Sequence, residues 1–407
     1  IFERKSYFYP DTPRNFQITQ MEKPLVIGGT IIVNVDGENK TFALNRAHLE
    51  DDAGMLKHFV SFAGIDFNRA GVPLLEVVSE PVMHSPKEAV AYVMALRAIM
   101  QYINASECNM EEGHLRIDAN ISVRRKGEET LRNKTEIKNM NSFNFLEMAI
   151  EQEIRRQIKL YSDNPHADIA TLIIPGTYRW DATEKQLILM RHKENAEDYR
   201  YFPEPDLMPL IVTAAEIAAI KKTLPELPHA RFERYVASYQ LSPYSAAILI
   251  NDKKIADYFE AALQSCQNAK ALCNWLTIEF AGRLKEKHTS LLSLQIPPAN
   301  IAQLINMLEE GQITGRIAKM VADEMMLAPQ KTPAEIVKAN PNFQPLSDDK
   351  AIEKIIDSIL LANPQSVLDY KNGKDRALKF LMGQIMKETH GKCDPQIATR
   401  LLKAKLS

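Results

Sequence analysis

The sequence predicts an α+β protein whose first half is mixed and whose second half is helical. Up to about Pro209, stretches that alternate apolar and polar residues with the period of a strand are interrupted by helical ones. Beyond Ala214 the strand signals fade, and helical spacing takes over between prolines. We therefore expect a mixed domain around a largely antiparallel sheet over residues 1–211, a helical domain over 212–335 and a small helical tail domain over 336–407.

Length and composition set the broad class of the chain. It has 407 residues, of which 45% are hydrophobic and 25% charged, as is ordinary for a globular chain of two or three domains. The net charge of −2 means that any attraction to nucleic acid or lipid must be local. The longest apolar runs are too short to cross a bilayer, so we expect no membrane association. Because the chain opens at Ile1 rather than Met, with no basic-then-apolar leader, we expect a missing N-terminal segment.

The cysteines are scattered along the chain and form no CxxC pair. They are Cys108, Cys266, Cys273 and Cys393. This spacing predicts buried, reduced thiols rather than zinc ligands or disulfides. A reducing cytoplasm follows as the expected location.

Three elements are expected within the first hundred residues. Residues 31–35 and 41–44 predict a hairpin whose turn lies at Asp36-Gly37. The apolar run 74–78 is consistent with a buried strand. At Ser85-Pro86, serine as the N-cap and proline at the first helical position predict the start of a helix.

Strands and helices continue to alternate through the rest of the first half. Residues 115–124 and 133–139 predict two-faced strands, the second is followed by a helix over 142–161, and 187–190 predicts a further strand. In the second half, helix starts are predicted at Ser242-Pro243 and Asn251-Asp252.

One face of the predicted strand 115–124 carries unusual side chains. Its odd positions are apolar, and its even positions are Arg116, Asp118, Asn120, Ser122 and Arg124. Asp and Asn are poor strand formers, and a conflict between local propensity and structure often marks a functional site. A solvated strand face remains the alternative.

Acidic side chains lie near predicted strands at three places. The first is the triplet Glu50-Asp51-Asp52, and the second is Glu76 inside the apolar run. The third is Asp118 with Glu136 on the neighbouring strand, where alternation puts lysines 134 and 138 on the face of Glu136. A wet loop and an exposed sheet edge are the ordinary explanations of the first two.

Taken together, these carboxylates and cations favour Mg²⁺ and a polyphosphate. Mg²⁺ prefers a few carboxylates together with substrate phosphates, and a transferring phosphoryl group needs positive charge around it. The sequence contains no GxxxxGK[ST] loop, no HExxH pair and no GxSxG elbow, so a P-loop site, a metalloprotease and an acyl hydrolase are not indicated. We expect His48 and His114 to be structural.

The last residues of the chain are locally basic. From Lys371 onward, nine basic residues stand against three acidic ones. Candidates for phosphate contacts are Lys371, Lys374, Arg376, Lys379 and Lys387. A solvated helix surface is the alternative, which composition alone favours.

Several long motifs together resemble one family, the GatB family of the glutamyl/aspartyl-tRNA amidotransferase. They are RKSYFYPD at 4–11, QITQ at 17–20, HLEDDAG at 48–54, NRAGVPLLEVVSEP at 68–81, MEEGHLRIDANIS at 110–122, EIKNMNSF at 136–143, DYRYFPEPD at 198–206, YKNGK at 370–374 and GQIMK at 383–387. The resemblance covers essentially the whole chain.

The resemblance implies an ATP-dependent ligase subunit. In that family the side-chain carboxylate of Glu or Asp, esterified to tRNA(Gln) or tRNA(Asn), attacks the γ-phosphate of ATP. Ammonia from a separate amidase (glutaminase) subunit then displaces the acyl phosphate, and a small third subunit completes the assembly. The implied cofactors are ATP and Mg²⁺. The implied fold is a cradle-like catalytic domain followed by helical domains, the last of which grips the tRNA.

The resemblance also implies roles for individual residues. Asp51 and Glu76 would be magnesium ligands, with Glu50 as a third candidate. Asp118 and Glu136 would line the activation centre.

Four further residues are expected around that centre. Arg116, Lys138 and Asn141 would contact phosphate or the acyl group. Arg200 would contribute to cofactor binding or form a structural ion pair.

The sequence departs from the family pattern at two places. A Gly-Leu-Glu-Val-His-like motif, whose Glu and His belong to the same metal centre, does not occur in the printed sequence. Asp51 stands where Glu is usual, which shortens the reach of that ligand. Two other functions stay open: a tRNA-binding module without chemistry, and a metal-dependent phosphoesterase.

Overall fold

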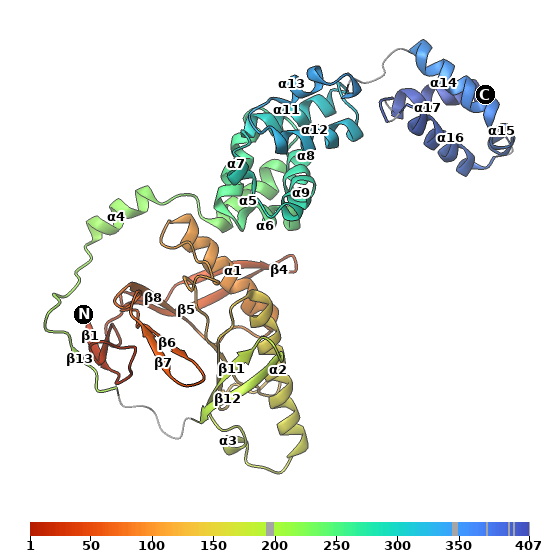
Figure 1. The fold of residues 1–407 in the computed structure, drawn as a ribbon. Helices are drawn as coiled ribbons and strands as arrows, with labels where there is room; N and C mark the ends of the chain where they lie inside the picture. The colour runs from red at the N-terminus through yellow and green to blue at the C-terminus, as the bar shows by residue number, and fades with distance from the viewer. Residues whose placement is uncertain (193–198, 344–348, 372, 390, 394, 407) are drawn as a thin grey trace. The chain divides into compact units, whose positions relative to one another are not determined.

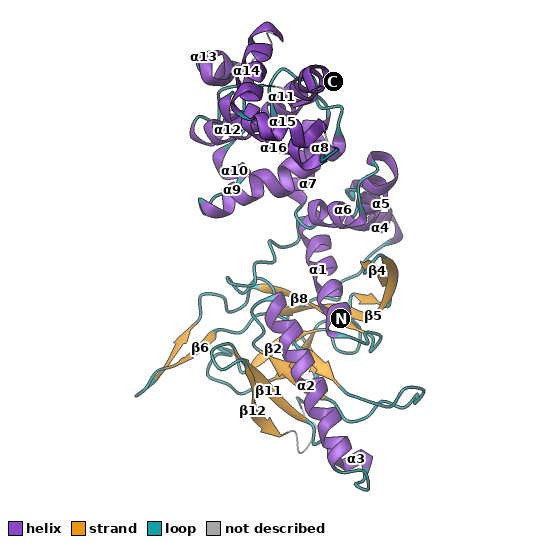
Figure 2. Ribbon diagram, turned by 90° about the vertical axis from the view of Figure 1, so that its right-hand side faces the viewer, coloured by secondary structure: helices purple, strands orange, loops and turns teal. Residues whose placement is uncertain are grey.

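The computed structural model describes residues 1–192, 199–343, 349–371, 373–389, 391–393 and 395–406. The chain divides into two compact units, Ile1–Ala230 and Arg231–Ser407, which we call the first and second unit. Figure 1 traces both, and in Figure 2 the strands drawn belong to the first unit while the second is helical. The predicted α+β class is therefore confirmed, and the division into three domains stays a prediction.

The strands of the first unit form several small sheets. One has the order β13-β1-β2, built from Phe202–Pro203, Glu3–Ser6 and Phe16–Thr19. A second has the order β3-β5-β4, built from Val26–Ile27, Glu38–Asp51 and Thr30–Val35, and β8 (Pro73–Ser79) also pairs with β5. A hairpin joins β6 (Met55–His58) to β7 (Ala63–Asp66).

The sheet that positions the candidate site has the order β12-β11-β10-β9. Its strands are Gln186–His192, Gly176–Asp181, Thr135–Lys138 and Ala119–Ile121. Strand β10 pairs antiparallel with β9 and parallel with β11, so the expectation of largely antiparallel pairing holds with one exception among the described strands.

Two helices, α1 (Pro86–Tyr102) and α2 (Phe143–Asp163), pack against these sheets and close the first core. The unit also contains the single turn α3 (Ile169–Leu172) and the helix α4 (Ala214–Thr223), and neither has a buried residue. Helix α1 packs on β4, and α2 packs on β9 and β12. The core between them includes Val33, Phe42, Ile137, Leu146 and Trp180.

The second unit is helical throughout its described residues. Its elements are α5 (Pro228–Tyr239), α6 (Pro243–Ile250), α7 (Lys253–Leu263), α8 (Ala269–Asn274), a π-helical turn (Trp275–Phe280), α9 (Ala281–Glu286), α10 (Leu291–Leu294), α11 (Pro298–Glu309), α12 (Gly315–Leu327), α13 (Pro333–Ala339), a 3₁₀ turn (Pro341–Phe343), α14 (Asp349–Ala362), α15 (Pro364–Lys371), α16 (Asp375–Glu388) and α17 (Pro395–Leu406). Two hydrophobic clusters hold it, one between Phe232 and Phe343 and one between Ile352 and Leu406.

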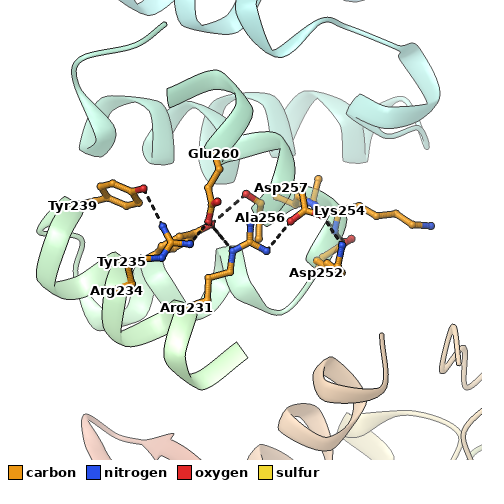
Figure 3. Close-up of polar contacts among 11 residues, drawn as sticks. Arg231, Arg234, Tyr235, Tyr239, Asp252, Lys254, Ala256, Asp257 and Glu260 are labelled. Carbon is orange, nitrogen blue, oxygen red and sulfur yellow. Dashed lines mark hydrogen bonds and ion pairs between the residues drawn. The ribbon is translucent and has the colours of Figure 1, made fainter. Parts of the chain in front are cut away.

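A partly buried polar network joins α5 to α7 at the start of the second unit (Figure 3). Arg231 donates from Nε to Glu260 Oε1 at 2.8 Å, and Arg234 donates to the same oxygen at 2.6 Å. The hydroxyl of Tyr235 also reaches this oxygen, at 2.9 Å. One carboxylate on α7 therefore collects three donors from α5.

Several predicted elements are confirmed. Ser85 and Ser142 cap α1 and α2, and the hairpin β4–β5 turns at Asp36-Gly37, where both residues have positive φ. In the second unit, Ser242 and Asp252 cap α6 and α7.

Two strand predictions were wrong in extent or burial. The stretch 115–124 forms a strand only over Ala119–Ile121, because its partner β10 has four residues and pairs over three of them. The run 74–78 is a strand, but it is not buried: Leu75 is 42% exposed, and among the described strands β8 pairs with β5 alone.

Candidate active site

Strands β9 and β10 bring together three of the predicted site residues. Along β10, Thr135 and Ile137 are fully buried against α2, so alternation turns Glu136 and Lys138 to the opposite face. Lys138 Nζ donates to Asp118 Oδ2 at 2.5 Å and lies 3.2 Å from Glu136 Oε1. Asp118 directly precedes β9, so one ammonium group bridges two strands.

The neighbours of Lys138 keep it charged. Partial burial acts to lower the pKa of the ammonium group, but the charges and hydrogen bonds of Asp118 and Glu136 outweigh it and raise the pKa. Thr177 on β11 donates to Glu136 Oε2 at 2.9 Å and so fixes the second carboxylate. A charged lysine held this way is suited to neutralising a phosphate and unsuited to acting as a base.

A second group of donors forms where β5 pairs with β8. His48 and Glu50 alternate onto one face of β5, and His48 lies directly opposite Glu76 of β8. One donor atom from each of these side chains lies within 4.8 Å of the others. His48 Nε2 is 3.3 Å from Glu50 Oε1 and 3.9 Å from Glu76 Oε2.

The two carboxylates of this group have opposite pKa shifts. Burial acts to raise the pKa of Glu50, but hydrogen bonds from His48 and Thr19 outweigh it and lower the pKa. Burial and then the charge of Glu50 raise the pKa of Glu76. The negative charge on Glu76 is thus incompletely compensated, which is the condition that a bound cation relieves.

The donor set of His48, Glu50 and Glu76 fits a divalent cation. Carboxylates suit Mg²⁺ and Mn²⁺, and an imidazole nitrogen suits transition metals, so the set is chemically mixed. His48 is almost completely buried, and its Nδ1 has no hydrogen-bond partner among the described residues. Nε2 is the nitrogen that faces both carboxylates, so it is the imidazole atom that this donor set would offer a cation.

The sequence argument missed His48, which we expected to be structural. The signal was present as the alternation of His48 and Glu50, but the link to Glu76 depends on the pairing of β5 with β8, 28 residues further along the chain by register. Strand pairing between distant segments is not visible in a single sequence.

Asp51, the other predicted ligand, faces away from this group. Its side chain forms an ion pair with Arg14 and accepts a hydrogen bond from the backbone N–H of Ile18 at 2.6 Å. A cavity of about 250 Å³ lies beside it, and its lining includes Arg14, Phe16, Gln17, Asp51, Asp52 and Gly71.

Arg116 is likewise drawn toward the end of β5. Its guanidinium donates to Asp52 Oδ2 at 2.5 Å, and Arg69 lies 3.6 Å from the same oxygen. Arg116 therefore connects the segment before Asp118 with the segment after Glu50, rather than lying on the Lys138 cluster.

Asn141 and Arg200 are both exposed. Asn141 directly precedes Ser142, the N-cap of α2, and so follows β10 closely. Arg200 has a left-handed backbone conformation with φ of 49°.

The basic candidates of the tail lie on and beside α16. Arg376, Lys379 and Lys387 are exposed and, with Gly383 between them, follow helical spacing along one stripe. Lys374 forms an ion pair with Asp369 at 3.0 Å.

Comparison with known families covers nearly the whole chain. Residues 1–218 match the family model described as the GatB/GatE catalytic domain, and residues 257–406 match the one described as the GatB domain. The first match covers the strands that carry the two candidate groups, and the second covers most of the helical unit.

Close relatives share one description, the GatB subunit of the aspartyl/glutamyl-tRNA(Asn/Gln) amidotransferase. The relative from Protochlamydia amoebophila is 57% identical over 406 residues, which is 100% of this chain and 82% of the relative. The one from Chlamydia abortus is 56% identical over 100% of this chain and 83% of the relative. The one from Chlamydia pneumoniae is 54% identical over 98% of this chain and 82% of the relative.

The chain belongs to the GatB family of the aspartyl/glutamyl-tRNA amidotransferases. It is one component of a tRNA-dependent amidotransferase, a multi-subunit enzyme of the ligase class whose reaction depends on ATP. In the described part of the chain, no helix has both the length and the apolar character that crossing a membrane requires.

Proposed function

We propose that the first unit activates the side-chain carboxylate of Glu or Asp on its tRNA by transferring the γ-phosphoryl group of ATP to it. A carboxylate oxygen forms the new bond to phosphorus, and ADP leaves. Ammonia from an amidase partner then attacks the acyl carbon, and phosphate leaves. The products are Gln-tRNA(Gln) or Asn-tRNA(Asn), ADP and phosphate.

The observation that carries this proposal is the meeting of Asp118, Glu136 and Lys138 across two strands. Lys138 is held protonated between two carboxylates, so its charge is positioned before any substrate arrives. Charge that is fixed in advance stabilises a transferring phosphoryl group without reorganisation during the reaction.

His48, Glu50 and Glu76 would hold the divalent cation, which we propose is Mg²⁺. A bound Mg²⁺ would neutralise phosphate charge during the transfer. Glu76, the carboxylate with the raised pKa, gains most from the cation because its charge is the least compensated. Glu50 is already oriented by Gln17 and Thr19, at 3.0 and 2.8 Å, and so presents a fixed oxygen.

The exposed basic stripe on α16 would bind the tRNA body. Arg376, Lys379 and Lys387 lie along one face of the helix, where exposed cations can approach successive phosphates. The partners of the chain would be the amidase (glutaminase) subunit, the small third subunit and the charged tRNA. The cysteines are buried and none forms a disulfide in the described part of the chain, which supports assembly in the cytoplasm.

Replacing Asp118 with Asn tests the activation site. The change removes a charge but little volume, so Lys138 loses one of its two partners while the strands keep their packing. We expect ATP-dependent acyl-phosphate formation by the assembled enzyme to fall by at least about 100-fold, by analogy with other sites that rely on positioned charge. The affinity for tRNA, measured separately, should stay within about twofold.

The matched control is Glu151→Gln on α2, which breaks an exposed pair with Arg155. It should leave both measurements unchanged. Wild-type rates in Asp118→Asn would contradict the proposed role of the β9–β10 group.

A further inference from the structure

Beneath the candidate site, helix α2 carries a buried polar network whose role the proposed chemistry does not explain. Its members are Glu153 and Gln157 of α2 and Thr135 of β10, and all three are fully buried. Thr135 Oγ1 donates to Glu153 Oε1 at 2.6 Å, and Gln157 Nε2 lies 2.7 Å from the same oxygen. Burying polar groups costs free energy, but a fully hydrogen-bonded network holds the elements that it joins in one arrangement.

The side chain of Gln157 forms hydrogen bonds with the backbone at the end of β9 and just after it. Its Nε2 donates to the carbonyl of Ile121 at 3.1 Å, and its Oε1 accepts from the backbone N–H of Val123 at 3.0 Å. The same Nε2 lies 3.1 Å from Thr135 Oγ1. A single side chain therefore bonds the end of β9 and the start of β10 at once.

Arg156 completes the network on the outer side. It donates from Nε and Nη2 to the two oxygens of Glu153, both at 2.7 Å, and its guanidinium stacks on the Tyr178 ring with 4.9 Å to the ring centroid. Tyr178 lies on β11, opposite Ile137 of β10. The network thus ties α2 to three adjacent strands.

The register of β9 against β10 decides whether the site exists. The paired residues are Ile121 with Thr135, Asn120 with Glu136, and Ala119 with Ile137, so the next rung places Asp118 opposite Lys138. A slip by one residue would turn Asp118 to the other face and break its contact with Lys138. Three pairs in an edge strand specify register weakly, and the side chain of Gln157 adds two bonds that a one-residue slip would break.

We propose that Gln157 and Glu153 are positioning residues that set the register of β9 against β10 and so hold Asp118 opposite Lys138. The inference rests on the proposed function of that pair. Gln157 bonds the backbone of β9, and Glu153 orients Gln157 and Thr135 while Arg156 balances its charge. None of these side chains lies on the face that carries Lys138, so they act through the strands.

The test compares variants of the full chain in the assembled amidotransferase, with ATP and charged tRNA. Gln157→Leu and Thr135→Val remove polar atoms at nearly constant volume, and Thr135→Ser restores the hydroxyl of Thr135. Gln152→Leu is the matched control: Gln152 also lies on α2 and accepts from a strand N–H, that of Leu187 at 2.8 Å, but on β12 at the far edge of the sheet.

We expect Gln157→Leu and Thr135→Val to lower kcat by at least about tenfold, because small displacements of positioned groups cost that much or more. The KM values for ATP and tRNA should stay within about twofold. Thr135→Ser should recover most of the wild-type kcat. Gln152→Leu should lower Tm, by less than Gln157→Leu because Gln152 is only half-buried, and should keep kcat within about twofold.

Turnover at the wild-type rate in Gln157→Leu and Thr135→Val overturns the positioning role. So does an equal loss of kcat in Gln152→Leu, which would show that general destabilisation of the sheet explains the effect. Asp118→Asn separates the two levels of the argument. If it is inactive while Gln157→Leu is fully active, only the positioning role fails; if it is fully active, the proposed function fails.

Discussion

At the scale of single residues, Glu50 and Glu76 show how the local environment shifts the pKa values of two identical side chains in opposite directions. Both are glutamates of adjacent strands, yet the pKa of Glu50 is lowered and that of Glu76 is raised. Glu50 has donors in Gln17 and Thr19, whereas Glu76 faces the charge of Glu50 and is 3.9 Å from the imidazole of His48. In the absence of a cation, ionised Glu76 therefore opposes folding at neutral pH.

Glu76→Gln should separate cation binding from folding. The neutral side chain removes the repulsion with Glu50, so the cation-free protein should be as stable as the wild type or more stable. Cation binding should be lost, because a carboxylate ligand is missing. At a concentration of Mg²⁺ or Mn²⁺ about 100-fold above the dissociation constant, linkage predicts that the cation raises the free energy of unfolding of the wild type by roughly 2.7 kcal/mol. This corresponds to a rise in Tm of several degrees.

The measurement is thermal unfolding with and without the cation, and the matched control is Glu80→Gln. Glu80 follows the same strand and accepts a hydrogen bond from Asn45. Glu80→Gln should keep the cation-dependent rise in Tm, and Glu76→Gln should show none. A full rise in Glu76→Gln would place the cation elsewhere.

Residue types and alternation were enough to predict part of the candidate site. Period two along 133–139 places Glu136 and Lys138 together, and the structure brings both to Asp118. The family resemblance made both Asp51 and Glu50 ligand candidates, although adjacent residues of a strand face opposite sides, and Asp51 pairs with Arg14. His48 was missed because its partner Glu76 is set by strand pairing, which is a property of the tertiary fold.

At the scale of elements, local signals predicted helix starts better than strand lengths. The caps at Ser85, Ser142, Ser242 and Asp252 each accept the backbone hydrogen bond that their residue type predicts. A helix cap depends on a few neighbouring residues, so it can be predicted from the local sequence. The length of β9 depends on how far β10 continues beside it, so the pattern over 115–124 overstated the strand.

Helix α16 is the element expected to contact tRNA phosphates. Replacing Arg376 and Lys379 together with Ala should weaken tRNA binding and reduce the slope of log affinity against log salt by roughly one unit for each lost contact. The buried face of the helix, which includes Leu381 and Ile385, is untouched, so the fold should persist. Binding is measured by salt titration.

Lys405→Ala is the control within the same part of the chain. Lys405 already pairs with Asp357 at 2.7 Å, so it has little free charge to offer a phosphate. Its loss should leave the salt slope unchanged. If the Arg376/Lys379 variant and the control give the same slope as the wild type, tRNA binds elsewhere.

At the scale of the whole molecule, the two units have separate cores and separate polar networks. The first unit is held by the cluster around Phe42, Ile137 and Trp180, and the second begins with the network of Arg231, Arg234 and Glu260. Neither the Glu153 network of the first unit nor the Glu260 network of the second could be predicted from the sequence, because each joins polar side chains on different helices or strands. We therefore expect a destabilising change in one unit to leave the unfolding of the other unaffected.

Glu260→Gln tests this separation and the weight of the network in Figure 3. Burial acts to raise the pKa of Glu260, but hydrogen bonds from Arg231, Arg234 and Tyr235 outweigh it and hold the pKa below its ordinary value. A carboxylate with a lowered pKa stabilises the fold above its unfolded pKa, and this stability is lost as pH falls through the folded value. The contribution should therefore be complete at pH 7, begin to fall near the ordinary glutamate pKa of about 4.3, and be lost once the pH is below the lower folded value.

Arg231 is almost completely buried and also pairs with Asp257 at 2.8 Å, so Glu260→Gln removes one of its two charged partners. Glu260→Gln keeps one acceptor oxygen and Glu260 is partly exposed, so we expect a loss of about 1–2 kcal/mol at pH 7, observed as a lower Tm for the second unit only. The control Asp323→Asn breaks an exposed pair with Arg283 and should change stability by less than about 0.5 kcal/mol. Scanning calorimetry at pH 7 and under acid conditions decides the outcome: a loss that persists in acid, or that also shifts the transition of the first unit, would show that charge pairing within the second unit is not what Glu260 supplies.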